Sequence, residues 1–164
     1  MNRIHFKKSV LAVIPAFAAF LVMQACGGSD SAVAQEATAD PIEGVWEGVV
    51  TIRDCTTSAP IVIFLGSQMF NRAGTMNDTN SSPTATRGPG WGTWVKTATG
   101  YVIKFRFFTY DSTGVVNGVA RTIRTVSPGA TAGSLNGVNS AQFFDLSGTL
   151  VRSTCGTDTG TKVL

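Results

Sequence analysis

The sequence predicts an all-β fold: a single eight-stranded, antiparallel, up-and-down β-barrel that follows a signal peptide and a flexible tether. Three observations lead to this prediction. Apolar and polar residues alternate along short segments, turn sequences recur between these segments, and no long segment carries a helical stripe. The alternation is clearest at residues 101–107, where apolar side chains hold the odd positions and Lys104 and Arg106 hold even ones. A period of two gives a strand one buried face and one wetter face.

The first 25 residues are expected to be a lipoprotein signal peptide, residues 26–40 a flexible tether, and residues 41–164 the barrel domain. A basic head precedes an apolar run, Val10 to Met23, that is too short for a durable membrane span. The run ends before Cys26 and a Gly/Ser segment, which resembles a bacterial lipoprotein signal with its lipobox. The resemblance implies a lipid anchor on Cys26 that holds the protein on the cell membrane or outer membrane, facing the periplasm. The alternative is secretory cleavage after Ala34, which would release a soluble exported protein.

Turn sequences divide the remaining chain into consecutive strands of alternating direction. Asn71, Asp111 and Asp145 each begin a four-residue turn that ends in Gly, a residue that readily adopts positive φ. Consecutive strands joined by such short turns pair antiparallel. The expected strands are 44–55, 62–70, 75–80, 91–97, 101–110, 115–126, a seventh ending at Phe144, and 149–163, with an irregular loop at 81–90.

Two cysteines favour closure of this meander into a barrel. Cys55 ends the first expected strand, and Cys155 lies within the last, 100 residues later. An even pair in an exported chain favours a disulfide, the alternative being two buried free thiols. If Cys55 lies opposite Cys155, antiparallel pairing places Trp46 opposite Leu164. Closure would remove the two exposed edges of an open sheet.

Composition excludes several classes of function. The net charge is +3, but three of the thirteen Lys and Arg lie in the leader, and the rest of the chain has ten basic and ten acidic residues. No basic patch for nucleic acid is therefore expected. The only His, His5, also lies in the leader, which excludes a His-based triad and disfavours zinc. Asp54, Asp111 and Asp145 lie at turns, where backbone capping accounts for them. We expect no catalytic residue, metal or cofactor, and the protein is not expected to be an enzyme.

The order of several motifs resembles a known superfamily. Gly44-Val45-Trp46 on the first strand, the meander and a late basic residue resemble the calycin superfamily of lipocalins and their relatives. The segment 87–94, with Cys155-Gly156-Thr157, also resembles exported bacterial lipocalin-like proteins of uncharacterised function. The resemblance implies that Trp46 closes one barrel end beneath Arg152 or Lys162, of which Lys162 fits the expected register better. It also implies binding of a small hydrophobic molecule.

The barrel interior is the candidate ligand site. The residues expected to line it are the inward-facing side chains of the fifth strand and the tryptophan of the first strand. They are Trp46, Tyr101, Ile103, Phe105 and Phe107. Phe105 is central in this row and is expected to be nearly inaccessible to solvent, so its truncation to Ala would cost about 3–5 kcal/mol. The alternative for these residues is a dry, filled core.

Three further residues are candidate ligand contacts. Trp91 and Trp94 have opposite parity, so one should face inward; with the 81–90 loop as a lid, one of them would contact ligand. The alternative is core packing of one Trp and a surface position for the other. Arg121 would need an anion if it faced inward. We favour the other reading, in which small residues such as Ala120 face inward and Arg121 lies on the surface.

The leading hypothesis is a lipid-anchored envelope barrel that binds a small, largely apolar ligand without catalysis. One alternative is an envelope structural or interaction protein with a filled barrel. Another is a barrel enzyme similar to the allene oxide cyclases or dirigent proteins. A cavity of about 300 Å³ or more would favour ligand binding.

The lipid anchor gives the first prediction. Cys26→Ser should release the protein from membranes or block its processing, because the anchoring sulfur is lost. Membrane fractionation and mass spectrometry of the N-terminal peptide measure this. A wild-type chain that begins at Gln35 without a diacylglyceryl group would contradict the prediction.

Overall fold

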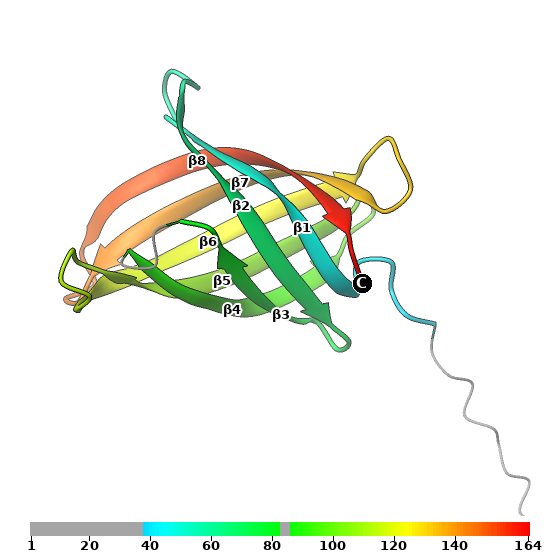
Figure 1. The fold of residues 1–164 in the computed structure, drawn as a ribbon, viewed down its shortest axis with the longest axis horizontal. Coiled ribbons are helices and arrows are strands. Elements are labelled where there is room, and N and C mark those ends of the chain that lie inside the picture. Colours follow the sequence, from blue (N-terminus) through cyan, green and yellow to red (C-terminus); the bar gives the residue numbers. More distant parts are fainter. Residues whose placement is uncertain (1–37, 83–85) are drawn as a thin grey trace, which may run out of the picture. The chain divides into compact units, whose positions relative to one another are not determined.

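The computed structural model describes residues 38–82 and 86–164, which form a closed barrel of eight antiparallel strands (Figure 1). Each strand pairs with its neighbours in chain order and the first also pairs with the last, so the predicted up-and-down barrel is confirmed. The described ranges contain no helix that could cross a membrane. The strands are β1 (Gly44–Arg53), β2 (Pro60–Asn71), β3 (Thr75–Asn80), β4 (Arg87–Lys96), β5 (Tyr101–Tyr110), β6 (Val116–Pro128), β7 (Ser134–Asp145) and β8 (Leu150–Lys162).

The fourth strand begins earlier than the sequence predicts. β4 starts at Arg87, so the second half of the loop expected at 81–90 belongs to the sheet. A β-bulge makes this possible, because Gly88 and Pro89 together oppose a single residue of β5. A bulge is also a position at which a sheet accepts proline. The prediction of a long irregular lid is therefore wrong for this half, and residues 83–85 lie outside the described residues.

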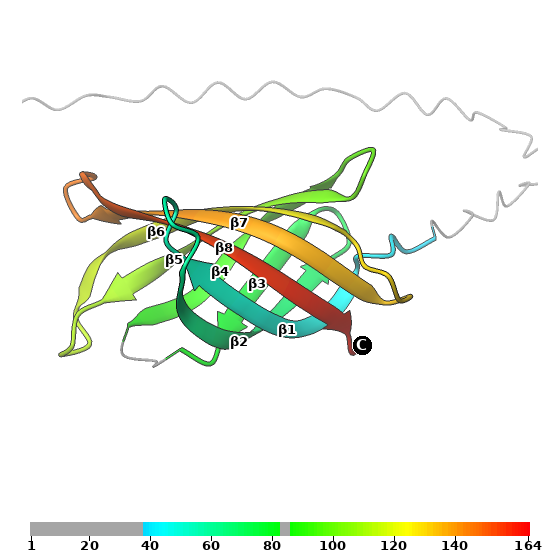
Figure 2. The same cartoon turned by 90° about the horizontal axis from the view of Figure 1, so that it is seen from above.

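β1 and β8 lie side by side and close the barrel (Figure 2). The predicted disulfide between Cys55 and Cys155 is confirmed, with the two Cα atoms 5.1 Å apart. The register differs from the expected one by two residues, because Arg53 lies opposite Cys155 and Trp46 lies opposite Lys162. Cys55 follows the end of β1 instead of lying within it. A shift of two residues leaves every side chain on its expected face.

One end of the barrel, which we call the plug end, is filled by side chains. Ile42 is buried beneath Trp46, whose Nε1 donates a hydrogen bond of 2.7 Å to the Ile42 carbonyl oxygen. Lys162 lies over Trp46, with Nζ 5.9 Å from the ring centroid, and donates to the Pro41 carbonyl oxygen. Of the two basic residues considered for the position over Trp46, Lys162 occupies it, and Arg152 lies over Phe143 instead. The buried residues packed together here are Ile42, Trp46, Phe70, Met76, Trp94, Tyr101, Ile103, Val126 and Leu135.

Asp40, which the sequence assigns to the tether, contacts the barrel at the plug end. Its carboxylate accepts hydrogen bonds from the Tyr101 hydroxyl and, at 2.9 Å, from Lys96 Nζ. Burial alone would raise the pKa of Asp40, but the hydrogen bonds from Tyr101, Lys96 and the Ile42 N–H outweigh burial and lower it. Burial and the hydrogen bond to Asp40 raise the pKa of Tyr101 to about 12. Contacts with the barrel therefore begin before residue 41.

Tyr101 should titrate well above an ordinary tyrosine. The chain has two tyrosines, so Tyr110→Phe leaves Tyr101 as the only phenol, and its ultraviolet absorbance should change with a pKa of about 12 in the folded protein. The unfolded chain should titrate near pH 10 (about the value of free tyrosine). Folding raises this pKa, so the stability that Tyr101 contributes is complete below about pH 10 and is lost as the pH rises through about 12. An ordinary tyrosine titration in the folded variant would contradict the hydrogen bond to Asp40.

Candidate functional site

Beyond the plug, the barrel encloses a cavity of about 710 Å³. It extends toward the opposite end, where the β1–β2, β5–β6 and β7–β8 connections lie, and which we call the cavity end. Alternation along the strands turns every second side chain into this space. The apolar part of the cavity wall is largely aromatic and includes Val50, Ile52, Phe64, Phe105, Phe107 and Phe143.

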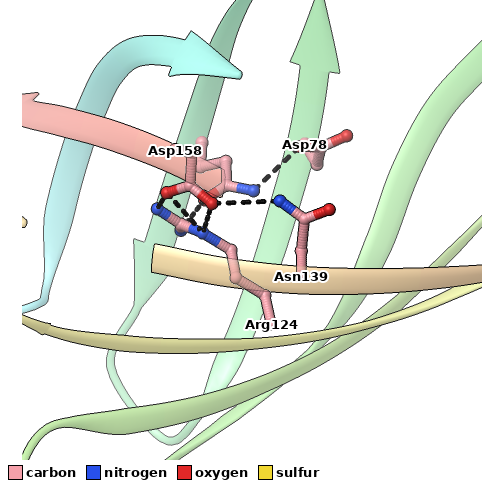
Figure 3. Close-up of polar contacts among 5 residues, drawn as sticks. Asp78, Arg124, Asn139 and Asp158 are labelled. Atoms are coloured by element: carbon pink, nitrogen blue, oxygen red, sulfur yellow. Dashed lines mark hydrogen bonds and ion pairs between the residues drawn. The ribbon is translucent and has the colours of Figure 1, made fainter. Parts of the chain in front are cut away.

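A buried ion pair crosses the deep part of the cavity. Arg124 on β6 and Asp158 on β8 are only 7% and 6% exposed, and their side chains point toward one another inside the barrel (Figure 3). Arg124 Nε lies 3.0 Å from each carboxylate oxygen of Asp158, and Nη2 contacts the same carboxylate. Asn139 on β7 donates to Asp158 from 3.2 Å. The ion pair lies directly above the plug, because Arg124 pairs across the sheet with the buried Ile103.

A second ion pair is linked to the first by an amide. Arg87 on β4 donates to Asp78 on β3, and the Arg87 guanidinium carbon lies 3.8 Å from the centroid of the Phe107 ring. Gln68 on β2 joins the two pairs, since its Nε2 donates to Asp78 at 2.9 Å and its Oε1 accepts from Arg124. We call the connected side chains the polar network; they are Gln68, Asp78, Arg87, Arg124, Asn139 and Asp158.

Complete partnering allows this network to be buried. A buried charge without a partner is strongly destabilising, whereas a paired and hydrogen-bonded one is tolerated. Among the described residues, no buried side-chain nitrogen or oxygen lacks a hydrogen-bond partner. Glycines make the space, because Gly137 lies opposite Asp158, and a Cβ on Gly137 would approach the Asp158 carboxylate to 2.4 Å. Gly90 lies opposite Asp78 in the same way.

The predicted lining is divided between the plug and the cavity. Trp46, Phe105 and Phe107 line the cavity, whereas Tyr101 and Ile103 pack in the plug-end core. Phe105 is half-buried, so the expectation that it is nearly inaccessible is wrong. The reason is that the Phe105 ring packs against the plug-end core but also lines the cavity, which leaves part of the ring uncovered. The fully buried residue of this row is Ile103.

The other three candidate contacts lie away from the cavity. Trp94 faces inward but packs in the plug-end core, where its Nε1 donates to the Asn71 carbonyl oxygen at 3.1 Å. Trp91 faces outward against Phe108, with ring centroids 5.3 Å apart. Arg121 is exposed and lies over Phe144, 4.6 Å from its ring centroid. The expectation that a tryptophan of β4 contacts ligand therefore finds no support in the cavity lining.

Sequence reasoning overlooked Arg124. The sequence pattern favoured the even-numbered residues of the sixth strand as the ones that face inward. The burial of Ala120, Thr122 and Val126 confirms this. The same parity places Arg124 inside the barrel. Arg124 was therefore detectable, but its partner Asp158 was not, since a pairing between the sixth and eighth strands depends on barrel geometry.

The three turn aspartates cap their own turns, as predicted. Asp54 Oδ1 accepts the backbone N–H of Thr57 at 2.7 Å, which is the main cause of its lowered pKa. Side-chain hydroxyls, from Thr113 and Ser147 respectively, are the main cause of the lowered pKa of Asp111 and Asp145. Within residues 38–82 and 86–164, no group of three or more His, Cys, Asp and Glu side chains is placed to hold a metal ion.

Comparisons of the chain with protein-family models, with curated proteins and with solved structures found no match. The eight-stranded closed barrel is compatible with a lipocalin-like fold. Any statement of function therefore rests on the site itself.

Truncations on β5 should test the assignment of its two faces. Ile103→Ala should lower the free energy of unfolding by about 2–5 kcal/mol, the usual cost of truncating a buried aliphatic side chain. Phe105→Ala should cost less than Ile103→Ala, because one side of the ring already faces open space. Lys104→Ala, on the outer face, should stay within about 0.5 kcal/mol of wild type. Denaturant melts measure all three, and a Lys104→Ala variant that is the least stable would reverse the assigned faces.

Proposed function

We propose that the barrel binds a small, largely apolar molecule in its interior, without catalysis. The observation that carries the proposal is the cavity of about 710 Å³. Small-molecule sites commonly have volumes of about 300–1,000 Å³, apolar and aromatic walls and a few polar groups that orient the ligand. The phenylalanines of the wall and the polar network beneath them have this character. A completely filled barrel, which would favour a purely structural role, is not supported.

The rim of the cavity end supports entry of an apolar molecule. Aliphatic side chains on the connections or beside them are exposed there, including Ile61 near the start of β2 at 63%, Val115 at 61% and Leu146 at 74%. Val62 and Val151 join the exposed set and also line the cavity. Exposed apolar groups that gather at one place are typical of ligand or partner sites.

The proposed location is the cell envelope, with a lipid anchor on Cys26 or, alternatively, release after Ala34. The disulfide between Cys55 and Cys155 supports an oxidising compartment, because such bonds persist in exported proteins. The periplasmic face of a membrane is such a compartment.

A second candidate function is a protein contact on the outer face of β1 and β2. Val49 pairs with Leu65 and Thr51 with Ile63, and Val49, Ile63 and Leu65 are 41%, 63% and 63% exposed. This patch lies outside the cavity, so it is compatible with ligand binding. An enzymatic function receives less support, since seven of the eight described acids cap a turn or pair with a cation. The eighth, Glu47 on β1, is among the residues that line the cavity, but its side chain is exposed.

A cavity-filling variant should test ligand binding. Ala141 on β7 is buried and lines the cavity, so Ala141→Phe should occupy ligand space and weaken binding of the fluorescent apolar probe N-phenyl-1-naphthylamine by about tenfold or more, a loss of about 1.4 kcal/mol. The control is Ser140→Phe, one residue away on the exposed face, which should bind as wild type does. Equal probe binding by all three proteins would place the probe outside the barrel and contradict the proposal. Native mass spectrometry of protein from its own cells would identify a ligand that co-purifies.

A further inference from the structure

We propose that the deep part of the cavity selects a ligand that ends in an uncharged, hydrogen-bonding group, so that the natural ligand is a neutral amphiphile. This inference rests on the proposed ligand-binding function. It follows from the polar network, which holds the four largely buried charged side chains of the cavity lining.

The network is neutral as a whole. Two aspartates face two arginines, and each acid has its own guanidinium, Asp158 with Arg124 and Asp78 with Arg87. The exposed fractions of the four side chains are 12% or less, so water screens these charges poorly. The protein thus supplies the counter-ions itself, and the deep cavity requires no charge from a ligand.

A charged group would have to compete with a partner that is already in place. Arg124 directs Nε and Nη2 to Asp158 and Nη1 to Gln68, so an incoming carboxylate would meet Asp158 at the same guanidinium. Displacing Asp158 would leave its carboxylate buried with only Asn139 as a donor. An ammonium group would likewise have to compete with the two guanidinium groups for the carboxylates of Asp78 and Asp158. Uncompensated buried charge is costly, whereas a hydroxyl or carbonyl can add hydrogen bonds without breaking either ion pair.

Among the described residues, the cavity lining holds one further cation, Arg152, at the cavity end. Its guanidinium lies over Phe143, 4.0 Å from the ring centroid, and the side chain is exposed. An ion pair with an exposed arginine contributes little, because solvent and salt screen it. Arg152 therefore gives an acidic ligand a weak site at the rim and does not offset exclusion from the deep cavity.

Three ligands of equal chain length and different head groups test the inference on the wild-type protein. Dodecanol, dodecanoate and dodecylamine at neutral pH should each displace N-phenyl-1-naphthylamine, with dodecanol about tenfold or more tighter than either charged ligand. Dodecanoate or dodecylamine binding as tightly as dodecanol would overturn the inference and leave the proposed function standing. Failure of all three to displace a bound probe would overturn the proposed function and the inference with it.

Removing one acid should reverse the preference. Asp158→Asn keeps the shape but leaves the Arg124 charge without its carboxylate, so dodecanoate should become the tightest of the three ligands. Asp78→Asn removes the carboxylate that pairs with Arg87, so it should also make dodecanoate the tightest ligand. This variant replaces Asp158→Asn in the test if Asp158→Asn does not fold. Arg121→Gln on the outer face and Arg152→Gln at the rim are the controls, and both should keep dodecanol tightest. An unchanged order in the folded aspartate variants would overturn the inference.

Discussion

The pairing of β1 with β8 is the constraint on which the rest of the structure depends. It converts a meander with two exposed edges into a closed sheet, and only a closed sheet has an inside. Once the register of this pairing is set, alternation decides for every strand which side chains enter the interior. The plug, the cavity and the polar network are all consequences of that decision. The Cys55–Cys155 disulfide holds the pairing in place beside the cavity end.

The barrel interior is divided along its axis by side-chain size and chemistry. Large apolar residues such as Trp46, Phe70 and Trp94 fill the plug end, and Ile42 seals it from below. Farther along, smaller residues such as Thr122 and Ala141 line the cavity and leave it open. The polar network lies between these regions, where its charges are shielded from water and partnered by one another. A site with a closed floor, polar groups above it and apolar walls therefore arises from one repeated strand pattern.

Much of this could be predicted from the sequence because it is local. The turn aspartates and glycines identify the strand boundaries, and the period of two on β5 gives the correct faces. Features that depend on several strands could not be predicted. The bulge at Gly88 and Pro89 made strand residues look like a loop, and the ion pair of Arg124 with Asp158 joins residues 34 positions apart. Whether Phe105 meets packed neighbours or open space depends on the opposite wall of the barrel.

The position of the disulfide also bears on how the chain folds. The β1–β8 ladder joins residues about as far apart in sequence as the domain allows, and such non-local pairing is the slowest kind to form because a long loop must close first. Once Cys55 and Cys155 are linked, the segment between them is a closed loop even in the unfolded chain. The residues that form the last strand are then held close to those that form the first. Oxidation before folding would thus lower the effective contact order of the domain and remove about 4–5 kcal/mol of loop-closure entropy from the folding step. If the chain is exported unfolded into an oxidising space, as proposed above, it would gain folding speed from the same bond that stabilises the finished fold.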